Sequence, residues 1–556
     1  MFTIHDGEII FKEKYGSLSR QRLYVKPQDQ LNVVILDEEK TSEFTNLLTR
    51  IFLPQGYPDS VSRDYTNYQI WDTAQAFCST ITGILATQEV LRGVGVGDTT
   101  ATPLAATVTW VLKDGCGHLG KIFFAFSRGT HLDAYSKKWR LYADTLNDAA
   151  MCIEIALPAF KNYTTLMLCM STLMKAIVGV AGGATRAAMT QHHAIRGNLA
   201  DVSAKDSAQE TAVNLIASMV ALLIITLFGN SLTIFITMMV FHIIFNYFAV
   251  RSVCLRTLNE PRLLLIIERY LKHEVISKPC YVNSNEPIVF RHLGPIYLDE
   301  SLCGFQIKVG HSMKTSAKKN SKANYMKNVQ YVYKYNAYII FANIHARDIY
   351  IHLKDTATTD DILRSYFHAV LYGIVICAIN DYYLPIYKSP ENSSKPFPQI
   401  CATLQTAEWS KDTMETPSCE FNYEPSIELM GFLNRTVEKE WYRLSKGLEQ
   451  IGWDLKKHLI VTDEWRICTS KLVTKETPVA ESIIPEVLAT AASKVVTFID
   501  NNDDIVEKAI NEIKTYTIEP EGKPTEESSD MNAYLGITSN ETRPGSSHAT
   551  KSQNTQ

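Results

Sequence analysis

The sequence lacks the signals of several large protein classes. Its 55 lysines and arginines nearly balance 59 aspartates and glutamates, for a formal net charge of −4, so it carries no electrostatic footprint for nucleic acid. Its 11 cysteines show no CxxC pair and no paired Cys/His spacing. This argues against a disulfide framework or a zinc site and indicates reduced thiols facing a cytosol. The first residues contain no apolar run, so we expect no signal peptide.

Motifs for catalysis are also missing. The GVGVGD segment at residues 93–98 is not a dinucleotide fingerprint, because no strand precedes it and the last spacing is wrong. The sequence contains no GxxxxGK[ST], HExxH or GxSxG motif. We therefore expect no enzyme, no bound metal and no cofactor.

A long stretch without charge, residues 211–250, stands out among the features that are present. It contains no Asp, Glu, Lys or Arg. At about 1.5 Å per residue, one helix of that length would be about twice as long as a hydrocarbon core of roughly 30 Å is thick. Gly229-Asn230-Ser231 lies near the middle and signals a turn. We expect two membrane helices joined by a hairpin. The alternative, a buried hairpin of a soluble core, predicts polar residues on a solvent side, which this stretch does not have.

Four more apolar stretches, at residues 70–90, 103–126, 139–160 and 163–184, bring the number of candidate helices to six. If all six cross a membrane, the basic residues fall mostly on the side that holds the N-terminus. That pattern places both termini in the cytosol. The N-terminal side would carry Arg63, Arg128, Lys137, Lys138, Arg186, Arg196, Lys205, Arg251, Arg256 and Arg262, and the opposite side essentially Arg92 and Lys161.

The composition of the chain changes along its length and predicts four regions. Residues 1–50 form a soluble segment with strand-like runs at 8–11, 22–25 and 31–36. Residues 51–258 form the helical membrane domain. Residues 259–470 read as a cytosolic α+β domain, with helices at 262–271, 358–378 and 437–451 and strands at 288–292, 329–341, 348–352 and 459–468. Residues 471–556 hold one or two amphipathic helices and, from residue 515, a disordered tail. The fold class is mainly α.

The third candidate helix carries an unusual acidic face. Asp144, Asp148 and Glu154 fall within about a third of its circumference, and the rest of the helix is apolar. If this helix crosses the membrane, its carboxylates face the interior of the bundle and mark a path for a substrate, an ion or a proton. The alternative is an amphipathic helix whose acidic face lies in water.

Other charged residues could complete such a path. The helix from residue 103 offers Lys113, Asp114, His118 and Lys121 as partners for the acidic face, and Gly115, Gly117 and Gly120 would let another helix approach closely. Asp72 lies near the start of the first apolar stretch. Arg186 and the His192-His193 pair lie just past the fourth stretch, where a cytosolic gate would be. The alternative for the histidine pair is an ordinary solvated loop.

Four long motifs carry a resemblance to a known family. They are LPQGYPDSVSRDYTNYQIWD, TPLAATVTWVLKDGCGHLGKIFFAF, SKKWRLYADTLNDAAMCIEIALP and GGATRAAMTQHHAIRGNLADVSAKDSAQET. In this order, across roughly residues 45–470, they resemble the root UVB sensitive family. The resemblance implies a link to early seedling development, ultraviolet-B response and vitamin B6 homeostasis in plants, and association between family members. It brings no agreed biochemical activity.

Two functions follow as hypotheses. The first is an integral membrane protein that transports or binds a small polar or charged solute, for which the resemblance makes a vitamin B6 vitamer a candidate. The second is a non-catalytic membrane adaptor that recruits partners through its C-terminal domain, with its polar residues serving helix packing. The expected partners are the lipid bilayer, the solute and other family members, without nucleic acid. The two hypotheses differ in whether the acidic helix faces a cavity or packed side chains.

Overall fold

The computed structural model describes residues 7–14, 20–27, 33–39, 43–94, 103–289, 296–317, 323–384, 408–414 and 420–468. The chain divides into two units, Met1–Ser470 and Lys471–Gln556. The amphipathic helices and disordered tail expected in residues 471–556 therefore lie outside the described residues.

The N-terminal segment forms a small antiparallel sheet. Its strands are β1 (Gly7–Lys14), β2 (Arg20–Pro27) and β3 (Val34–Glu39), in the order β1-β2-β3. Leu23 and Val25 alternate along β2 and are both buried, as expected for a strand with one covered face. The strands expected at residues 8–11 and 22–25 are confirmed, and the third begins three residues later than expected. A short helix, α1 (Glu43–Phe52), follows.

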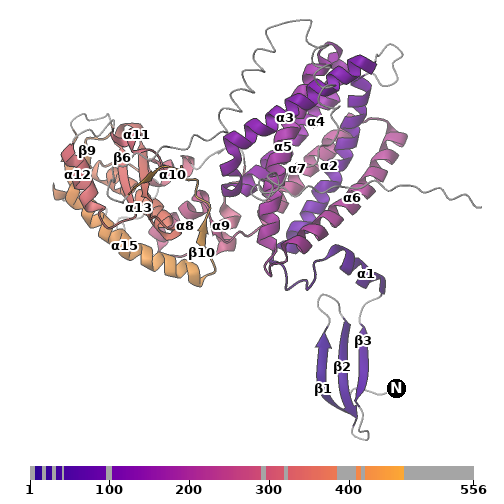
Figure 1. Cartoon of the computed structure of the whole chain (residues 1–556), viewed down its shortest axis with the longest axis horizontal. Coiled ribbons are helices and arrows are strands. Elements are labelled where there is room, and N and C mark those ends of the chain that lie inside the picture. Colours follow the sequence, from indigo (N-terminus) through magenta and orange to yellow (C-terminus); the bar gives the residue numbers. More distant parts are fainter. Residues whose placement is uncertain are drawn as a thin grey trace, which may run out of the picture. The chain divides into compact units, whose positions relative to one another are not determined.

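Six long helices form the next part of the chain and lie side by side in Figure 1. The hairpin turn expected near Gly229 is confirmed. This residue has a φ of +68°, a conformation that favours glycine, and the Ser231 side chain then caps the last helix by accepting the Ile234 N–H. The helices are α2 (Tyr65–Gly93), α3 (Pro103–Ala134), α4 (Ser136–Ala156), α5 (Thr164–His193), α6 (Leu199–Phe228) and α7 (Leu232–Ser252), with a 3₁₀ segment, η2 (Leu157–Tyr163), between α4 and α5.

Successive helices of the bundle run in opposite directions. At one end, called here the first end, Asp64 before α2 accepts hydrogen bonds from His192 at the end of α5 and from the backbone N–H of Cys254 after α7. At the second end, Asn230 between α6 and α7 donates to Glu89 near the end of α2 at 2.6 Å. These contacts fix an up-and-down order in which α2, α4 and α6 begin at the first end.

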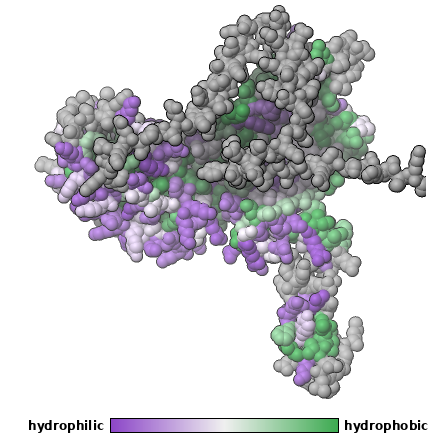
Figure 2. All heavy atoms as spheres, in the orientation of Figure 1, coloured by the Kyte–Doolittle hydropathy of each residue, from purple (hydrophilic) through white to green (hydrophobic). Residues whose placement is uncertain are grey.

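The outer surface of the bundle is strongly apolar. Three of its helices, α5, α6 and α7, are long and apolar enough to cross a membrane. Many large hydrophobic side chains exposed together are unusual on a soluble protein and mark an interaction surface. Hydrophobic residues are visible at the surface beside the mostly hydrophilic C-terminal region in Figure 2. The most exposed include Leu104, Val111, Leu119, Ile122, Phe123 and Phe126 of α3 and Leu215, Met219, Leu222, Leu227 and Phe228 of α6.

The C-terminal region is built around one buried helix, α13 (Thr359–Ile379). This helix is also long and apolar enough to cross a membrane, but nearly all of its apolar window is buried inside the protein, so we assign it to a core. A capping box of Thr358 and Asp361 starts it. It packs on a mixed sheet in which β7 (Asp348–Lys354) pairs with β6 (Tyr338–Asn343) antiparallel and with β5 (Gln306–Val309) and β11 (Arg466–Ile467) parallel.

The remaining elements surround this core. They are β4 (Thr257–Leu258), α8 (Glu260–His273), α9 (Pro279–Asn285), α10 (Ile296–Cys303), α11 (Met313–Ala317), α12 (Ala323–Val332), η3 (Ile344–Ala346), η5 (Glu408–Ser410), β8 (Lys411–Thr413), β9 (Tyr423–Pro425), α15 (Ile427–Gln450) and β10 (Asp454–His458). The expected helices are confirmed: α8 contains residues 262–271, α13 begins and ends one residue later than the expected 358–378, and α15 begins before the expected 437–451 and ends one residue earlier. The strand at 348–352 is confirmed within β7.

Two of the other expected strands are largely wrong. Residues 329–341 contain the end of α12, a turn and only then β6, although tyrosines alternate there. The reason is a tertiary contact: Asn336 in the turn and Asn434 of α15 exchange two side-chain hydrogen bonds of 2.9 Å, and such contacts override β propensity. Residues 459–468 form only the two-residue β11. Of residues 288–292, the described ones, 288–289, are not in a strand.

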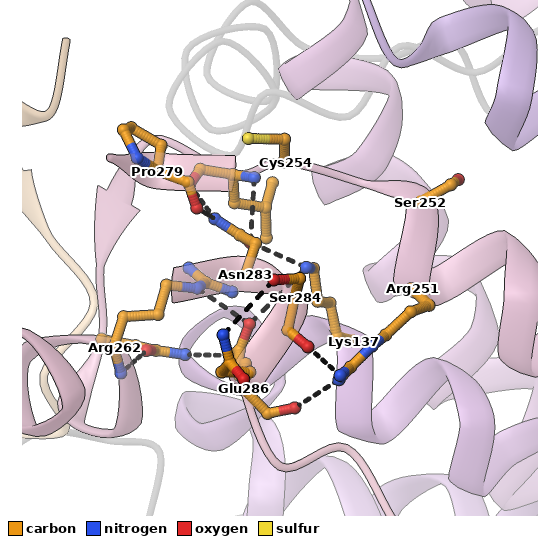
Figure 3. A network of polar contacts seen from close by, with 12 residues as sticks. Lys137, Arg251, Ser252, Cys254, Arg262, Pro279, Asn283, Ser284 and Glu286 are labelled. Atoms are coloured by element: carbon orange, nitrogen blue, oxygen red, sulfur yellow. Dashed lines mark hydrogen bonds and ion pairs between the residues drawn. The ribbon is translucent and has the colours of Figure 1, made fainter. Parts of the chain in front are cut away.

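A buried ionic network joins α4 to the segment that follows α7 (Figure 3). Lys137 donates to Asn283 at 2.7 Å and lies 3.6 Å from Glu286. Glu286 also accepts from Arg262 at 3.0 Å, and Arg251 donates to its backbone carbonyl at 2.9 Å. Burial alone would raise the pKa of Glu286, but the charges of Arg262 and Lys137 hold it below its usual range. These three basic residues, counted above toward the membrane orientation, therefore also have a structural role.

Candidate functional site in the helical bundle

Polar side chains of α2, α4 and α7 meet in the interior of the bundle. Along α2 they recur every three residues, at Asp72 and Gln75, on the side where α4 and α7 pack. This spacing keeps them on one helix face. We call the set the polar column; its members are Asp72, Gln75, Arg140, Asp144, Asp148, His242 and Asn246.

Arg140 holds one level of the polar column together. Its guanidinium lies 3.1 Å from Asp72 and 3.4 Å from Asp144. The Asn246 amide of α7 donates to the same Asp144 carboxylate at 2.6 Å. The side chain of Arg140 is 12% exposed and those of Asp72 and Asp144 are each 17% exposed, so these charges depend on each other more than on solvent.

His242 holds the next level, one helical turn further from the first end. Its Nδ1 lies 2.8 and 2.9 Å from the two Asp148 oxygens, and its Nε2 lies 2.9 Å from Gln75 Oε1. Gln75 in turn donates through Nε2 to Asp72 at 3.1 Å, which fixes its amide orientation. Because both ring nitrogens face oxygen atoms, we assign a proton to each nitrogen and an imidazolium–carboxylate pair to His242 and Asp148. The two levels are thus one continuous hydrogen-bonded network.

A second ionic cluster lies between the polar column and the first end. Asp206 of α6 accepts from Gln69 at 2.9 Å and from Arg186 at 2.8 Å. Arg186 also pairs with Glu210. Arg186 therefore ties α5 to α6 and, through Asp206, to α2. It lies within α5, two turns before the helix ends at His193.

The first end itself carries a group of residues that could hold a metal ion. One ligand atom each from Asp64, His192 and His193 lie within 4.8 Å of one another. These atoms already have partners: Asp64 bonds His192 at 2.9 Å, and Ser62 bonds His193 Nδ1 at 2.6 Å. Burial would raise the pKa of Asp64, but the hydrogen bonds and charge of His192, with those of Ser62 and the Cys254 N–H, hold it well below its usual range.

This arrangement is not a catalytic triad. A triad needs the histidine between serine and carboxylate, with one ring nitrogen for each. Here Asp64 Oδ1 lies 3.8 Å from His193 Nδ1, the same nitrogen that bonds Ser62. The contacts that the structure shows join the start of α2 to the end of α5 and to the segment after α7.

Apolar side chains close the bundle beyond the polar column. Ile81 and Leu85 of α2, Met151 of α4 and Phe235 of α7 form one buried cluster with small residues of α6. Thr80 of α2 also donates to Asn214 of α6 at 2.8 Å, and beyond the apolar cluster Glu89 bonds Asn230 and Arg92. The column is thus separated from the second end by an apolar plug.

The acidic helix is buried, which removes the alternative of an acidic face in water. The side chains of Asp148 and Glu154 are 3% and 8% exposed. Glu154, however, lies outside the polar column. It accepts from Ser171 at 2.5 Å and from Lys175 at 2.6 Å, both on α5.

The partners expected from α3 do not reach the acidic helix. Asp114 is 54% exposed and pairs with Lys113, which stacks on Trp110, and His118 and Lys121 are exposed. The cause is the packing of α3. Its small residues face α5, where a Cβ added at Gly117 would lie 3.0 Å from Thr172 and one at Gly120 would overlap Leu173. The close approach expected at these two glycines is confirmed, and it turns the charged residues outward.

Four residues that complete the column were missed from the sequence: Gln75, Arg140, His242 and Asn246. The last two carry a usable signal, since they are polar residues four apart within the stretch 211–250, which contains no Asp, Glu, Lys or Arg. Such residues are expected to face other helices and not lipid. Arg140 sits in the first turns of α4, where it reads as one more basic residue at a membrane boundary.

Comparison with known proteins gives the family. The model described as "Vitamin B6 photo-protection and homoeostasis domain" matches residues 38–274, and "Root UVB sensitive protein, C-terminal" matches residues 275–469. The chain is 31% identical over 427 residues to protein root UVB sensitive 3 of Arabidopsis thaliana, covering 74% of this chain and 94% of that protein. No solved structure matches it.

A second relative is more similar over a shorter stretch. The chain is 46% identical over 260 residues to RUS family member 1 of Dictyostelium discoideum, which is 45% of this chain and 49% of that protein. The aligned part thus spans about half of that relative. With both family models and the near-complete match to the Arabidopsis protein, the chain belongs to the root UVB sensitive (RUS) family.

Proposed function

We propose that this protein is an integral membrane protein that binds or transports a small polar or charged solute through the bundle of α2 to α7. The observation that carries the proposal is the polar column. Buried charges inside a bundle with an apolar exterior are costly, and in membrane proteins they mark substrate, ion or proton paths. All six helices would then cross the bilayer, with the first end and both termini in the cytosol.

The order of features along α2 supports a path that is closed in this structure. From Asp64 to Gln75 the helix rises about 17 Å, and polar contacts accompany it throughout. From Gln75 to Glu89 it rises about 21 Å past the apolar plug. A solute entering from the first end would have to pass the Arg186–Asp206 cluster, and one leaving by the second end would have to part the plug. Such paired barriers suit alternating access.

The nature of the solute rests on the family. The matched domain is described by vitamin B6 photo-protection and homoeostasis, so B6 vitamers are the first candidates. The described residues of the column offer carboxylate, guanidinium and amide groups, which bind polar solutes, but no nucleophile beside a base. Binding or transport therefore suits this site better than catalysis.

The adaptor function remains the second candidate, and one observation favours it: every carboxylate of the acidic helix is paired with packed side chains of α2, α5 or α7. A surface for a partner also exists on the C-terminal region. There α15 borders an open groove of about 790 Å³ lined by charged residues with Phe432, Trp441 and Tyr442. The lining also includes Arg364 and Arg435, and aromatic residues and arginine are enriched at protein interfaces.

Two experiments test the proposal. Carbonate extraction at high pH should leave the protein in the membrane pellet, because apolar spans cannot be stripped like a peripheral contact. Uptake of labelled pyridoxine, pyridoxamine and pyridoxal 5′-phosphate by liposomes containing the purified protein should then exceed uptake by protein-free liposomes for at least one of these solutes. Release by carbonate would end the membrane proposal. Equal uptake for all three solutes would favour the adaptor.

A further inference from the structure

The polar column contains more negative than positive charge. Asp72, Asp144 and Asp148 supply three carboxylates, against the Arg140 guanidinium and the His242 imidazolium. The Asp148–His242 pair is neutral, so the excess of one negative charge lies where Asp72 and Asp144 share Arg140. An excess of charge at a site with side chains no more than 17% exposed requires compensation.

The neighbouring ionic cluster does not supply this compensation. It also has two carboxylates, Asp206 and Glu210, for one guanidinium, Arg186. Glu210 is 42% exposed and can be balanced by solvent ions. The shortage of positive charge therefore persists beside Asp144.

An unpaired acceptor lies at the same place. Asn246 is 1% exposed, and its Nδ2 donates to Asp144. A carboxylate only accepts, so this bond assigns Nδ2 to Asp144 and leaves Oδ1, on the same amide carbon, as the remaining acceptor. Oδ1 is buried and has no hydrogen-bond partner among the described residues. A buried carbonyl oxygen of this kind needs a donor or a cation.

We infer that Asp144 and the Asn246 carbonyl bind a monovalent cation, either an alkali metal ion or the ammonium group of an amine. Two observations meet here: one missing positive charge, and one buried oxygen without a donor. Carboxylate and carbonyl oxygens suit both kinds of cation, and a single positive charge makes the column neutral. The cation site rests on the proposed function. It restricts the transported solute to one that has a cationic group or is transported together with a cation. The Asp144 carboxylate would repel an anionic phosphate, and the nearby Arg140 is already shared by two carboxylates.

Thermal unfolding of the purified full-length protein in detergent tests the cation site. Melting would be followed at constant ionic strength while sodium, potassium or methylammonium chloride replaces choline chloride, whose cation has no N–H and is too large to fit between paired side chains. A saturable rise of the melting temperature with one of the three is expected, because a ligand that binds only the folded state stabilises it. Methylammonium acting alone would identify an amine, and sodium or potassium a metal ion.

Two variants locate the effect. Asp144→Asn removes the excess charge and still accepts from Asn246, so it should raise the half-saturating concentration about tenfold or more, as the loss of a charged hydrogen-bond partner does. Glu89→Gln alters a buried carboxylate beyond the apolar plug that Arg92 already balances, and it should leave the concentration unchanged.

The melting temperature of the wild-type protein in the different salts tests the inference even if a variant fails to fold. Equal melting temperatures in all four salts, or stabilisation by divalent ions alone, would overturn the inference. An equally large cation-dependent rise of the melting temperature in Asp144→Asn would also overturn it. Saturable binding without solute uptake would leave the cation site standing and remove the transport proposal. Solute uptake that is insensitive to these cations and to Asp144→Asn would leave the transport proposal standing and remove the cation site.

Discussion

Removal of the Arg140 guanidinium gives the clearest test of the ionic core. Arg140→Met keeps the apolar stem of the side chain but leaves Asp72 and Asp144 facing each other without their shared cation. Removing one partner of a buried ion pair typically lowers the free energy of unfolding by about 3–5 kcal/mol. With side chains 12% and 17% exposed, this site falls in that range.

Removing the two unpaired carboxylate charges should restore the free energy of unfolding that Arg140→Met loses. Adding Asp72→Asn and Asp144→Asn to Arg140→Met eliminates the unpaired carboxylates, so the triple variant should regain most of the lost free energy. A matched control is Arg92→Met. Arg92 pairs with Glu89 at 3.1 Å but is 62% exposed, and an exposed pair contributes less than about 1 kcal/mol.

Equilibrium unfolding in mixed micelles, followed by tryptophan fluorescence, measures all of these variants. The expected order of stability is wild type, then Arg92→Met, then the triple variant, with Arg140→Met the least stable. If Arg140→Met lost no more than Arg92→Met, the ionic core would not be buried in the way described. If the triple variant showed no recovery, the loss would come from packing and not from charge.

Three further predictions concern other parts of the chain. Burial raises the pKa of Glu260 to about 7 from 4.5, against the lowering effect of its hydrogen bond from Tyr135. The folded state therefore holds a proton that the unfolded state loses first, so stability should fall by about 3 kcal/mol as pH rises from about 4.5 to 7, and thermal melts of Glu260→Gln should show a flatter profile. Gly120→Leu should force α3 away from Leu173 and lower the free energy of unfolding by about 1–3 kcal/mol, whereas Gly115→Leu, with open space around it, should not. Asn434 should stay unglycosylated, because its amide is bonded to Asn336 and we place it in the cytosol; a glycosidase-sensitive mobility shift abolished by Asn434→Gln would contradict this orientation.

The sequence predicted the helices of the bundle better than it predicted their contacts. The uncharged stretch with Gly229 at its centre specifies a helical hairpin through length and turn chemistry alone. The alternating tyrosines before β6 predicted a strand that is not there. The turn at this place depends on a hydrogen bond to Asn434, almost a hundred residues away. Local pattern cannot contain such a contact.

The same limit applies to the candidate site. Helical periodicity correctly grouped Asp144 and Asp148 on one buried face, because that information is local to α4. Their partners depend on how the helices are rotated against each other. The small residues of α3 pack on α5, so that His118 and Lys121 are exposed. Gln75, Arg140, His242 and Asn246 complete the column.

The measurement that tests the central claim most directly is complementation of a loss-of-function phenotype by the double variant Asp144→Asn with Asp148→Asn. In the double variant Asp72 still balances Arg140, and His242 can be neutral, with its Nδ1 accepting from the new amide at position 148 and its Nε2–H donating to Gln75, so expression, membrane insertion and melting temperature should stay close to those of the wild type. If the polar column carries a solute, this folded variant should fail to complement, whereas Glu89→Gln should complement fully. Full complementation by the double variant would contradict a transport role for the column and favour the adaptor.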